Sequence, residues 1–116
     1  MYRHILYEEF ETKTCFYCGK KLDEEKIHVD HFIPWSFIKD DNLWNLVLSC
    51  PKCNLNKKDK LPNIDFLTRI LDRNQTLLID IYKTEMHNYH AKKLLNIYDW
   101  AKVNGYSEEW IPKLMA

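Results

Sequence analysis

The sequence contains no uninterrupted apolar run of membrane-spanning length, no internal repeat and no low-complexity segment. A transmembrane helix needs about 20 consecutive apolar residues, so a membrane-spanning protein is not expected. Residues 1–9 include Arg3, Glu8 and Glu9, and this segment is too charged for a secretory signal peptide. We therefore expect an intracellular, cytoplasmic protein.

The chain also lacks a surplus of charge of either sign, because 17 basic residues balance 17 acidic ones. Proteins that bind nucleic acid commonly carry a basic surplus, so this balance argues against such a partner. Residues 52–60 are an exception, since they contain four lysines and one acidic residue, Asp59. That segment could still contact a phosphate backbone.

Hydrophobic residues make up 46% of the 116 residues and aromatic residues 14%, which is enough for a packed core. A chain of this length is expected to form one domain, or one compact domain with an appended helical piece. We expect the division after residue 61, between a core of residues 1–61 and a helical extension of residues 62–116.

Hydrophobic periodicity predicts short, mixed elements in the first half of the chain. Near-helical spacing predicts a helix over residues 2–10, and alternation of polar and apolar residues predicts a half-buried strand over residues 26–31. An apolar run predicts a second strand over residues 46–48. Residues 32–45 are rich in aromatic side chains and fit no single period, so a packed, ordered loop is expected. A lysine-rich helix is expected over residues 54–60.

The second half of the chain is expected to be helical. Asn63 can cap a first helix, and a longer helical pattern covers residues 76–104 and stops at Gly105. The apolar stripe of this long helix changes direction, so the helix either kinks near His90 or packs on two different neighbours. A last short helix is expected over residues 107–114. The elements together predict a small α+β fold.

Four cysteines form two matched CxxC pairs, which are Cys15 with Cys18 and Cys50 with Cys53. Inside cells such pairs bind a metal more often than they form disulfides. Four thiolates form a tetrahedral set that suits structural zinc and leaves no position open for a substrate. The alternative is four free buried cysteines. Residues 19–49 make a longer connection than a simple zinc ribbon has, so something is inserted between the pairs.

The insertion contains the adjacent residues Asp30 and His31. The order of motifs resembles the HNH endonucleases, and more narrowly the branch whose ββα-metal core is stapled by two CxxC pairs. The motifs that carry the resemblance are Asp30-His31 followed by Pro34, then Asn45-Leu46, then Cys50-Pro51-Lys52-Cys53-Asn54 and Lys57. The resemblance covers about residues 15–60 and does not extend to the helices beyond.

The resemblance implies a role for each matching residue. His31 would be the general base that activates water, and Asn45 would fix the local geometry and the orientation of His31. Asn54 stands where the family's final histidine often stands, so the motif reads HNN. Together with Asp30, it would hold one divalent cation.

The chemistry of phosphodiester hydrolysis also calls for these residue types. A neutral imidazole is a suitable base near pH 7, and a cation stabilises the charge that develops on the phosphate. A carboxylate and an amide oxygen are hard ligands that suit Mg²⁺ or Mn²⁺. Lys57 and Lys58 are expected to contact the substrate phosphates, although the simpler interpretation is a solvated turn.

Simpler interpretations exist for the other residues as well. An Asp-His pair is often a surface feature, and Asn54 could be a helix N-cap. His28 shares a strand face with Asp30 and could contact a substrate or a metal, or it could be an ordinary surface residue. His87 and His90 lie three apart on the helical pattern, but no third ligand accompanies them.

The sequence therefore predicts an HNH-type endonuclease that cuts DNA, most simply double-stranded DNA. The alternative is a non-catalytic zinc module that binds nucleic acid or protein, and RNA is a third option as substrate. A homodimer or a partner protein could bind through the C-terminal helices.

Overall fold

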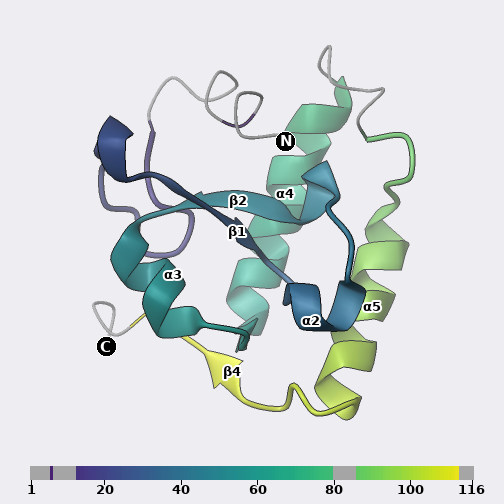
Figure 1. Ribbon diagram of the computed structural model, residues 1–116. Helices are drawn as coiled ribbons and strands as arrows, with labels where there is room; N and C mark the ends of the chain where they lie inside the picture. The colour runs from purple at the N-terminus through teal and green to yellow at the C-terminus, as the bar shows by residue number, and fades with distance from the viewer. Residues whose placement is uncertain (1–5, 7–12, 80–85, 113–116) are drawn as a thin grey trace.

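The computed structural model describes Leu6, residues 13–79 and residues 86–112 of the chain (Figure 1). The helix predicted over residues 2–10 lies outside the described residues, apart from Leu6. None of the helices in the described ranges is long and apolar enough to cross a membrane.

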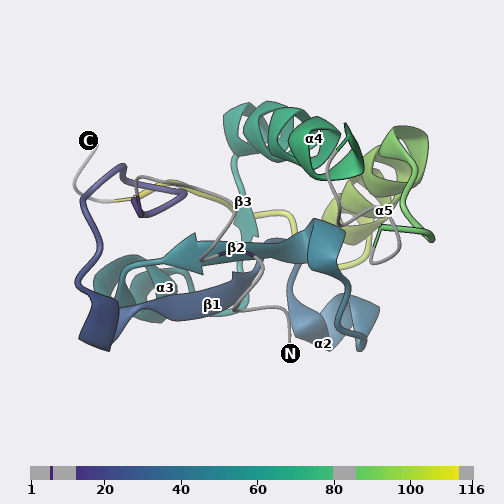
Figure 2. The same cartoon turned by 90° about the horizontal axis from the view of Figure 1, so that it is seen from above.

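A short antiparallel hairpin lies at the centre of the fold. Strand β1 (His28–His31) pairs with strand β2 (Leu46–Ser49), and Asp30 lies opposite Val47. Both strands agree with the prediction from the sequence. All four residues of β2 are buried, because α4 (Ile64–Ile79) lies across one side of the hairpin (Figure 2) and other elements cover the rest.

Helix α3 (Pro51–Lys57) follows the hairpin directly. The sequence predicts it to begin near residue 54, but the structure starts it three residues earlier, inside the second CxxC pair. Proline at the first helical position and the Cys50 sulfur, which accepts from the Cys53 backbone amide, start the helix there. Asn54 is therefore inside the helix, and the simpler interpretation of Asn54 as an N-cap is wrong.

The connection between the strands is packed and ordered, as predicted. It contains α2 (Trp35–Ile38) and a turn of 3-10 helix, η2 (Leu43–Asn45), and a second 3-10 turn, η1 (Glu24–Lys26), precedes β1. Four apolar side chains of this connection are part of the core, because Phe32, Ile33, Leu43 and Trp44 are buried. Trp35 is exposed.

Helix α4 holds the 3-10 turn η2 in place. The Asn74 side-chain amide donates to the Trp44 carbonyl oxygen at 2.9 Å, and the Arg73 guanidinium donates to the carbonyl oxygens of Leu43 and Trp44. Burial lowers the pKa of Arg73 to about 10, so the side chain stays charged at neutral pH. The C-terminal half of the chain thus fixes the segment that leads into Asn45.

The C-terminal helices differ from the prediction of one helix over residues 76–104. Asn63 caps α4 as predicted, accepting from the Asp65 amide, but α4 continues to Ile79. Helix α5 (Ala91–Val103) begins only after His90, whose side chain accepts from the Lys92 amide. Because a new helix begins just after His90, one continuous helix cannot pass through this residue. The apolar residues before and after His90 therefore lie on separate segments, which explains why their stripe changes direction.

The end of α5 agrees with the prediction. Gly105 has a φ of 103°, and the Tyr106 amide reaches back to the Ala101 carbonyl at 3.0 Å. This pattern closes a helix at a residue in the left-handed region, which glycine adopts without strain.

The prediction of a helix over residues 107–114 is wrong for those of its residues that the structure describes. Glu109–Trp110 form strand β4, which pairs in parallel with β3 (Leu61–Pro62). Trp110 is buried against Tyr17 at a centroid distance of 5.0 Å, and its indole N–H donates to Asn56. Burial of this large side chain outweighs the local helical preference.

The fold class is α+β, as predicted, with a hairpin and following helix that correspond to a ββα-metal core. One cluster of buried side chains runs from Cys15 through the hairpin to Trp110. The domain boundary predicted after residue 61 falls inside β3. The predicted division of the chain therefore stays a sequence-based proposal.

Candidate active site and metal centre

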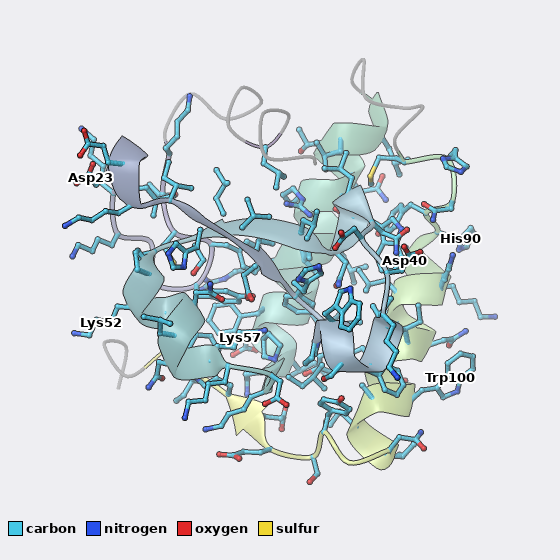
Figure 3. The ribbon with its side chains drawn as sticks, viewed as in Figure 1. Asp23, Asp40, Lys52, Lys57, His90 and Trp100 are labelled. Atoms are coloured by element: carbon cyan, nitrogen blue, oxygen red, sulfur yellow. The ribbon has the colours of Figure 1, made fainter. Side chains whose placement is uncertain are left out.

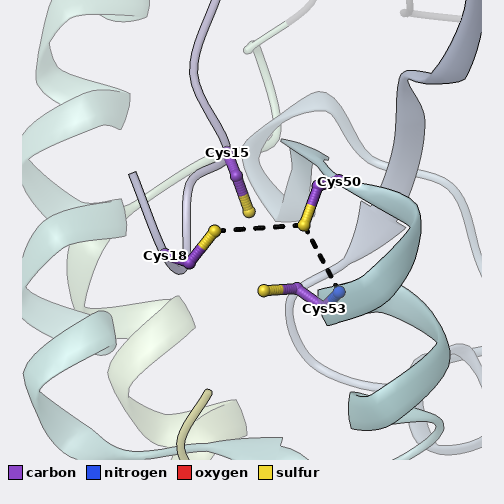
Figure 4. A group of neighbouring side chains, drawn as sticks. All are labelled: Cys15, Cys18, Cys50 and Cys53. Atoms are coloured by element: carbon purple, nitrogen blue, oxygen red, sulfur yellow. Dashed lines mark hydrogen bonds between the residues drawn. The ribbon is translucent and has the colours of Figure 1, made fainter. Parts of the chain in front are cut away.

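The four cysteine sulfurs converge on one point (Figure 4). All four sulfur atoms lie within 4.8 Å of one another, and the Cys18 and Cys50 sulfurs are 3.9 Å apart. A zinc ion bound tetrahedrally at about 2.3 Å from each sulfur would place the sulfurs about 3.8 Å apart. The cluster therefore fits a zinc ion, and none of the four cysteines forms a disulfide.

Local structure explains how each CxxC pair brings its two sulfurs together. The first pair closes a tight turn in which the Gly19 amide donates to the Cys15 carbonyl at 2.9 Å, and Gly19 adopts a φ of 76°. The second pair occupies the N-terminus of α3, so Cys50 and Cys53 are one helical turn apart.

The pKa values of the thiols show what a bound cation would have to compensate. Burial raises the pKa of Cys53 and of Cys18. For Cys15 burial also acts upward, but hydrogen bonds from the backbone of Cys18, Cys50 and Tyr17 outweigh it and lower the pKa. Four thiolates this close cannot all be charged unless a cation compensates them. The donor set and its environment thus match a metal that binds sulfur.

Asp30 lies in the interface between β1 and α3 and is only 7% exposed. Its Oδ2 atom accepts a hydrogen bond from the Tyr17 hydroxyl at 2.5 Å and lies 3.2 Å from the Lys57 ammonium. Burial, together with the Asp30 charge, raises the pKa of Tyr17 well above its ordinary value. Tyr17 is therefore a hydrogen-bond donor throughout the physiological pH range.

Lys57 is predicted to contact substrate phosphates, but its side chain lies in the interior of the protein. It is 0% exposed, and its ammonium donates to the His31 carbonyl oxygen at 2.9 Å in addition to pairing with Asp30. Figure 3 shows Lys57 pointing inward from α3, whereas Lys52 of the same helix points away. Burial lowers the pKa of Lys57 and the Asp30 charge partly compensates. In this structure Lys57 neutralises Asp30, whereas Lys58 is exposed.

Asn54 lies one helical turn before Lys57 and faces the same strand. Its side-chain amide donates to the Nδ1 atom of His28 at 2.9 Å, and His28 shares with Asp30 the face of β1 that meets α3. The structure therefore brings Asp30 and Asn54 to one interface, and it adds His28 to that group.

His31 is the last residue of β1 and points to the face opposite Asp30, because neighbouring strand residues alternate. Its side chain is 25% exposed, and its Nε2 atom lies 2.5 Å from the Oδ1 atom of Asp41. A carboxylate can only accept a hydrogen bond, so Nε2 carries the proton in this contact. The structure does not place the His31 ring at the interface that holds Asp30 and Asn54.

Asn45 is fully buried and holds the segment that follows His31. Its side chain accepts from the Ile33 amide at 2.9 Å and donates to the Ile33 carbonyl at 3.0 Å, and its own carbonyl accepts from the Phe32 amide. These three bonds fix the chain immediately after β1. The geometry suits a residue that positions others, since no part of the Asn45 side chain is exposed.

Two residues at the site escaped the sequence-based prediction. Tyr17 lies inside the first CxxC pair, and Asp41 lies in a polar turn between α2 and η2. Neither carries a signal that the sequence alone reveals, because each contact joins segments that only the tertiary fold brings together. His90, by contrast, is explained as the cap of α5. Within the described part of the chain, the four cysteines are the only group of three or more His, Cys, Asp or Glu side chains that could hold a metal ion.

Comparison with known proteins agrees with this architecture. Residues 15–63 match the family model described as HNH endonuclease, and the resemblance noted in the sequence is confirmed. The chain is also 37% identical over 57 residues to the CRISPR-associated endonuclease Cas9 of Streptococcus mutans serotype c (strain ATCC 700610 / UA159). The aligned part covers 47% of this chain and 4% of that protein.

Proposed function

We propose that this chain is a metal-dependent endonuclease that hydrolyses phosphodiester bonds in double-stranded DNA. The observation that carries the proposal is the β1–β2–α3 unit within the segment that matches the HNH family. This unit brings Asp30 and Asn54 to one interface and ends its first strand at His31.

The residues present fit a hard divalent cation such as Mg²⁺ or Mn²⁺. Asp30 and Asn54 would hold it, since carboxylate and amide oxygens are the ligands that these ions prefer. Tyr17 and Lys57 both contact Oδ2 of Asp30, so Oδ1 is the atom that Asp30 would offer. When bound, the cation would stabilise the negative charge that develops on the phosphate and the leaving oxygen.

His31 would accept the proton of the attacking water. With the Nε2–H group donating to Asp41, the neutral imidazole keeps a free lone pair on Nδ1, and that atom is the proposed base. Asn45 would keep the segment after His31 in place. Lys58 is exposed at the end of α3 and would contact a neighbouring phosphate.

The test is relaxation of a supercoiled plasmid with Mg²⁺ or Mn²⁺, resolved into nicked and linear products, with EDTA as control. Wild-type protein is expected to cut only with the metal, and His31→Ala is expected to lose activity by 100-fold or more, on the order that general-base catalysis contributes. His87→Ala, which changes an exposed histidine of the turn before α5, is the matched control. A His31→Ala protein that folds, retains zinc and cuts at the wild-type rate would show that the assigned mechanism is wrong.

One observation favours the alternative, a non-catalytic zinc module that binds nucleic acid. Asp30 is buried and already neutralised by Lys57, and His31 faces away from it. Under this alternative the zinc-loaded protein binds DNA or RNA without metal-dependent nicking. Matched DNA and RNA substrates in the same assay also decide which nucleic acid is cut.

A homodimer or a partner protein, bound through the C-terminal helices, remains a proposal. Its natural place is the outward face of α5, where Leu95, Trp100 and Val103 are exposed. Light scattering of the purified protein, compared with a Trp100→Ala variant, tests for self-association through this face.

A further inference from the structure

Tyr17 connects the cysteine cluster to the candidate active site. It lies between Cys15 and Cys18 in the first CxxC pair, and its side chain is fully buried. Its ring meets Phe66 and Trp110 edge-on at centroid distances of 5.6 and 5.0 Å. The hydroxyl at the far end of the ring donates to Asp30.

The turn that carries Tyr17 is fixed on several sides. The Cys15 amide donates to the Lys20 carbonyl, and the Phe16 amide donates to the Leu48 carbonyl of β2 at 2.9 Å. A metal bound by Cys15 and Cys18 would fix the two residues that flank this segment. The position of the phenol hydroxyl therefore depends on a turn that the metal closes.

Asp30 receives both of its contacts on one oxygen. The Tyr17 hydroxyl and the Lys57 ammonium approach Oδ2 from the first CxxC turn and from α3. Two donors on the same oxygen hold the carboxylate in a single orientation, and this orientation decides where Oδ1 points. Groups that orient a metal ligand in this way commonly change metal affinity by about 10-fold or more.

We infer that Tyr17 is a positioning residue that couples the four-cysteine cluster to the cation site at Asp30. Zinc at the cluster fixes the phenol, and the phenol holds the Asp30 carboxylate ready for the divalent cation. This inference rests on the proposed function, since it takes Asp30 to be a cation ligand. It assigns the zinc site a second effect beyond stabilising the fold.

The first test compares two tyrosine variants of the zinc-loaded protein. Tyr17→Phe removes only the hydroxyl that contacts Asp30. Tyr98→Phe is the matched control, because Tyr98 is equally buried and its hydroxyl donates to the Pro62 carbonyl instead. We expect Tyr17→Phe to keep its zinc and to bind Mn²⁺ about 10-fold more weakly by electron paramagnetic resonance. Tyr98→Phe is expected to bind Mn²⁺ like the wild type.

The second test needs no change in Tyr17. Coupling between two binding sites is reciprocal, so a cation at Asp30 must also tighten metal binding at the cluster. Co²⁺ in place of zinc reports cluster occupancy through its sulfur absorption bands. We expect saturating Mg²⁺ to raise the apparent Co²⁺ affinity against a competing chelator about fivefold or more. This effect should vanish in Asp30→Asn and in Tyr17→Phe, but persist in Tyr98→Phe.

Two results would overturn the inference. One is a Tyr17→Phe protein whose Mn²⁺ affinity stays within twofold of the wild type. The other is a wild-type protein in which Mg²⁺ has no effect on Co²⁺ retention, which decides the matter even if Tyr17→Phe fails to fold. Failure of the proposed function is distinguishable, because Asp30→Asn would then bind Mn²⁺ as well as the wild type does.

Discussion

The cysteine cluster and the candidate active site share helix α3 but are built in opposite ways. The cluster consists of four sulfurs of the same residue type that converge on one point. The residues of the candidate site are single side chains from separate elements, and each is held by its own neighbour: Asp30 by Tyr17 and Lys57, Asn54 by His28, and His31 by Asp41. The cluster is thus defined by its ligands, whereas the site is defined by the residues that hold its ligands.

This contrast predicts different sensitivities to substitution. Loss of any one ligand should disable the cluster as a whole, because a tetrahedral set with three sulfurs is incomplete. Loss of one neighbour at the candidate site should change one contact and leave the rest in place. Substitutions in the two regions should therefore differ in size and in what they alter.

The largest effect is expected for Cys50→Ser, which removes a sulfur ligand but keeps a side chain that can cap α3. Structural zinc contributes on the order of 10 kcal/mol to folding of small domains, which is comparable to the entire stability of a typical domain of about 5–15 kcal/mol. We expect this variant to lose zinc and its cooperative thermal transition, measured by metal content and circular dichroism. Lys52→Ala, at an exposed position inside the same CxxC pair, is the control and should retain zinc.

A Cys50→Ser protein that melts like the wild type would erase the contrast, because the cluster would then contribute no more than a single contact of the candidate site does.

The next effect is expected for Lys57→Met, which leaves the Asp30 carboxylate buried without its ammonium partner. Removing one member of a buried ion pair typically costs about 3–5 kcal/mol. Urea unfolding should show a loss of this order, while zinc content stays at the wild-type level. Lys58→Met changes the adjacent exposed lysine and should have little effect on stability.

A double variant sharpens the interpretation of Lys57. Adding Asp30→Asn to Lys57→Met removes the stranded charge, so much of the lost stability should return. If the single and double variants unfold alike, Lys57 contributes by packing, and the interface between β1 and α3 is less dependent on charge than the structure indicates.

The same contrast explains what could be predicted from the sequence. The two CxxC pairs and the strands β1 and β2 follow from local spacing, so the sequence predicts them correctly. Asp30 and Asn54 were singled out by their order in a motif, and the structure brings them to one interface. Their roles as cation ligands stay a proposal.

The features that escaped prediction depend on contacts between distant segments. Trp110 forms a strand because it packs on Tyr17, and nothing in residues 107–114 reveals that neighbour. The break before α5 depends on the His90 cap, whose single side chain has little weight in a periodic pattern. Lys57 belongs to a lysine-rich segment that the sequence predicts to be exposed, but it is buried because its ammonium pairs with the Asp30 carboxylate.

The smallest effect on stability, with a distinct effect on function, is expected for Asp41→Ala. The Asp41 side chain is 45% exposed and its bond to His31 lies near the surface, where such a pair is worth about 1 kcal/mol or less. The unfolding free energy should therefore hardly change. The proposed base, however, loses the carboxylate that keeps its proton on Nε2, so the fraction of His31 with a free Nδ1 lone pair falls. We expect DNA cleavage to slow by about tenfold, on the scale of one lost orienting contact.

Nitrogen NMR of the His31 ring separates orientation from a general loss of structure. Wild-type protein should show the proton on Nε2, and Asp41→Ala should show a mixture of the two neutral forms. Asp41→Asn, whose amide oxygen can still accept from Nε2–H, should restore much of the wild-type pattern. Asp99→Ala, at an exposed position on α5, should leave both the ring and the cleavage rate unchanged. Asp41→Ala could instead keep the wild-type ring signals and cut at the wild-type rate. That result would mean that the backbone held by Asn45 orients His31. The candidate site would then depend less on individual neighbouring side chains than the contrast with the cluster requires.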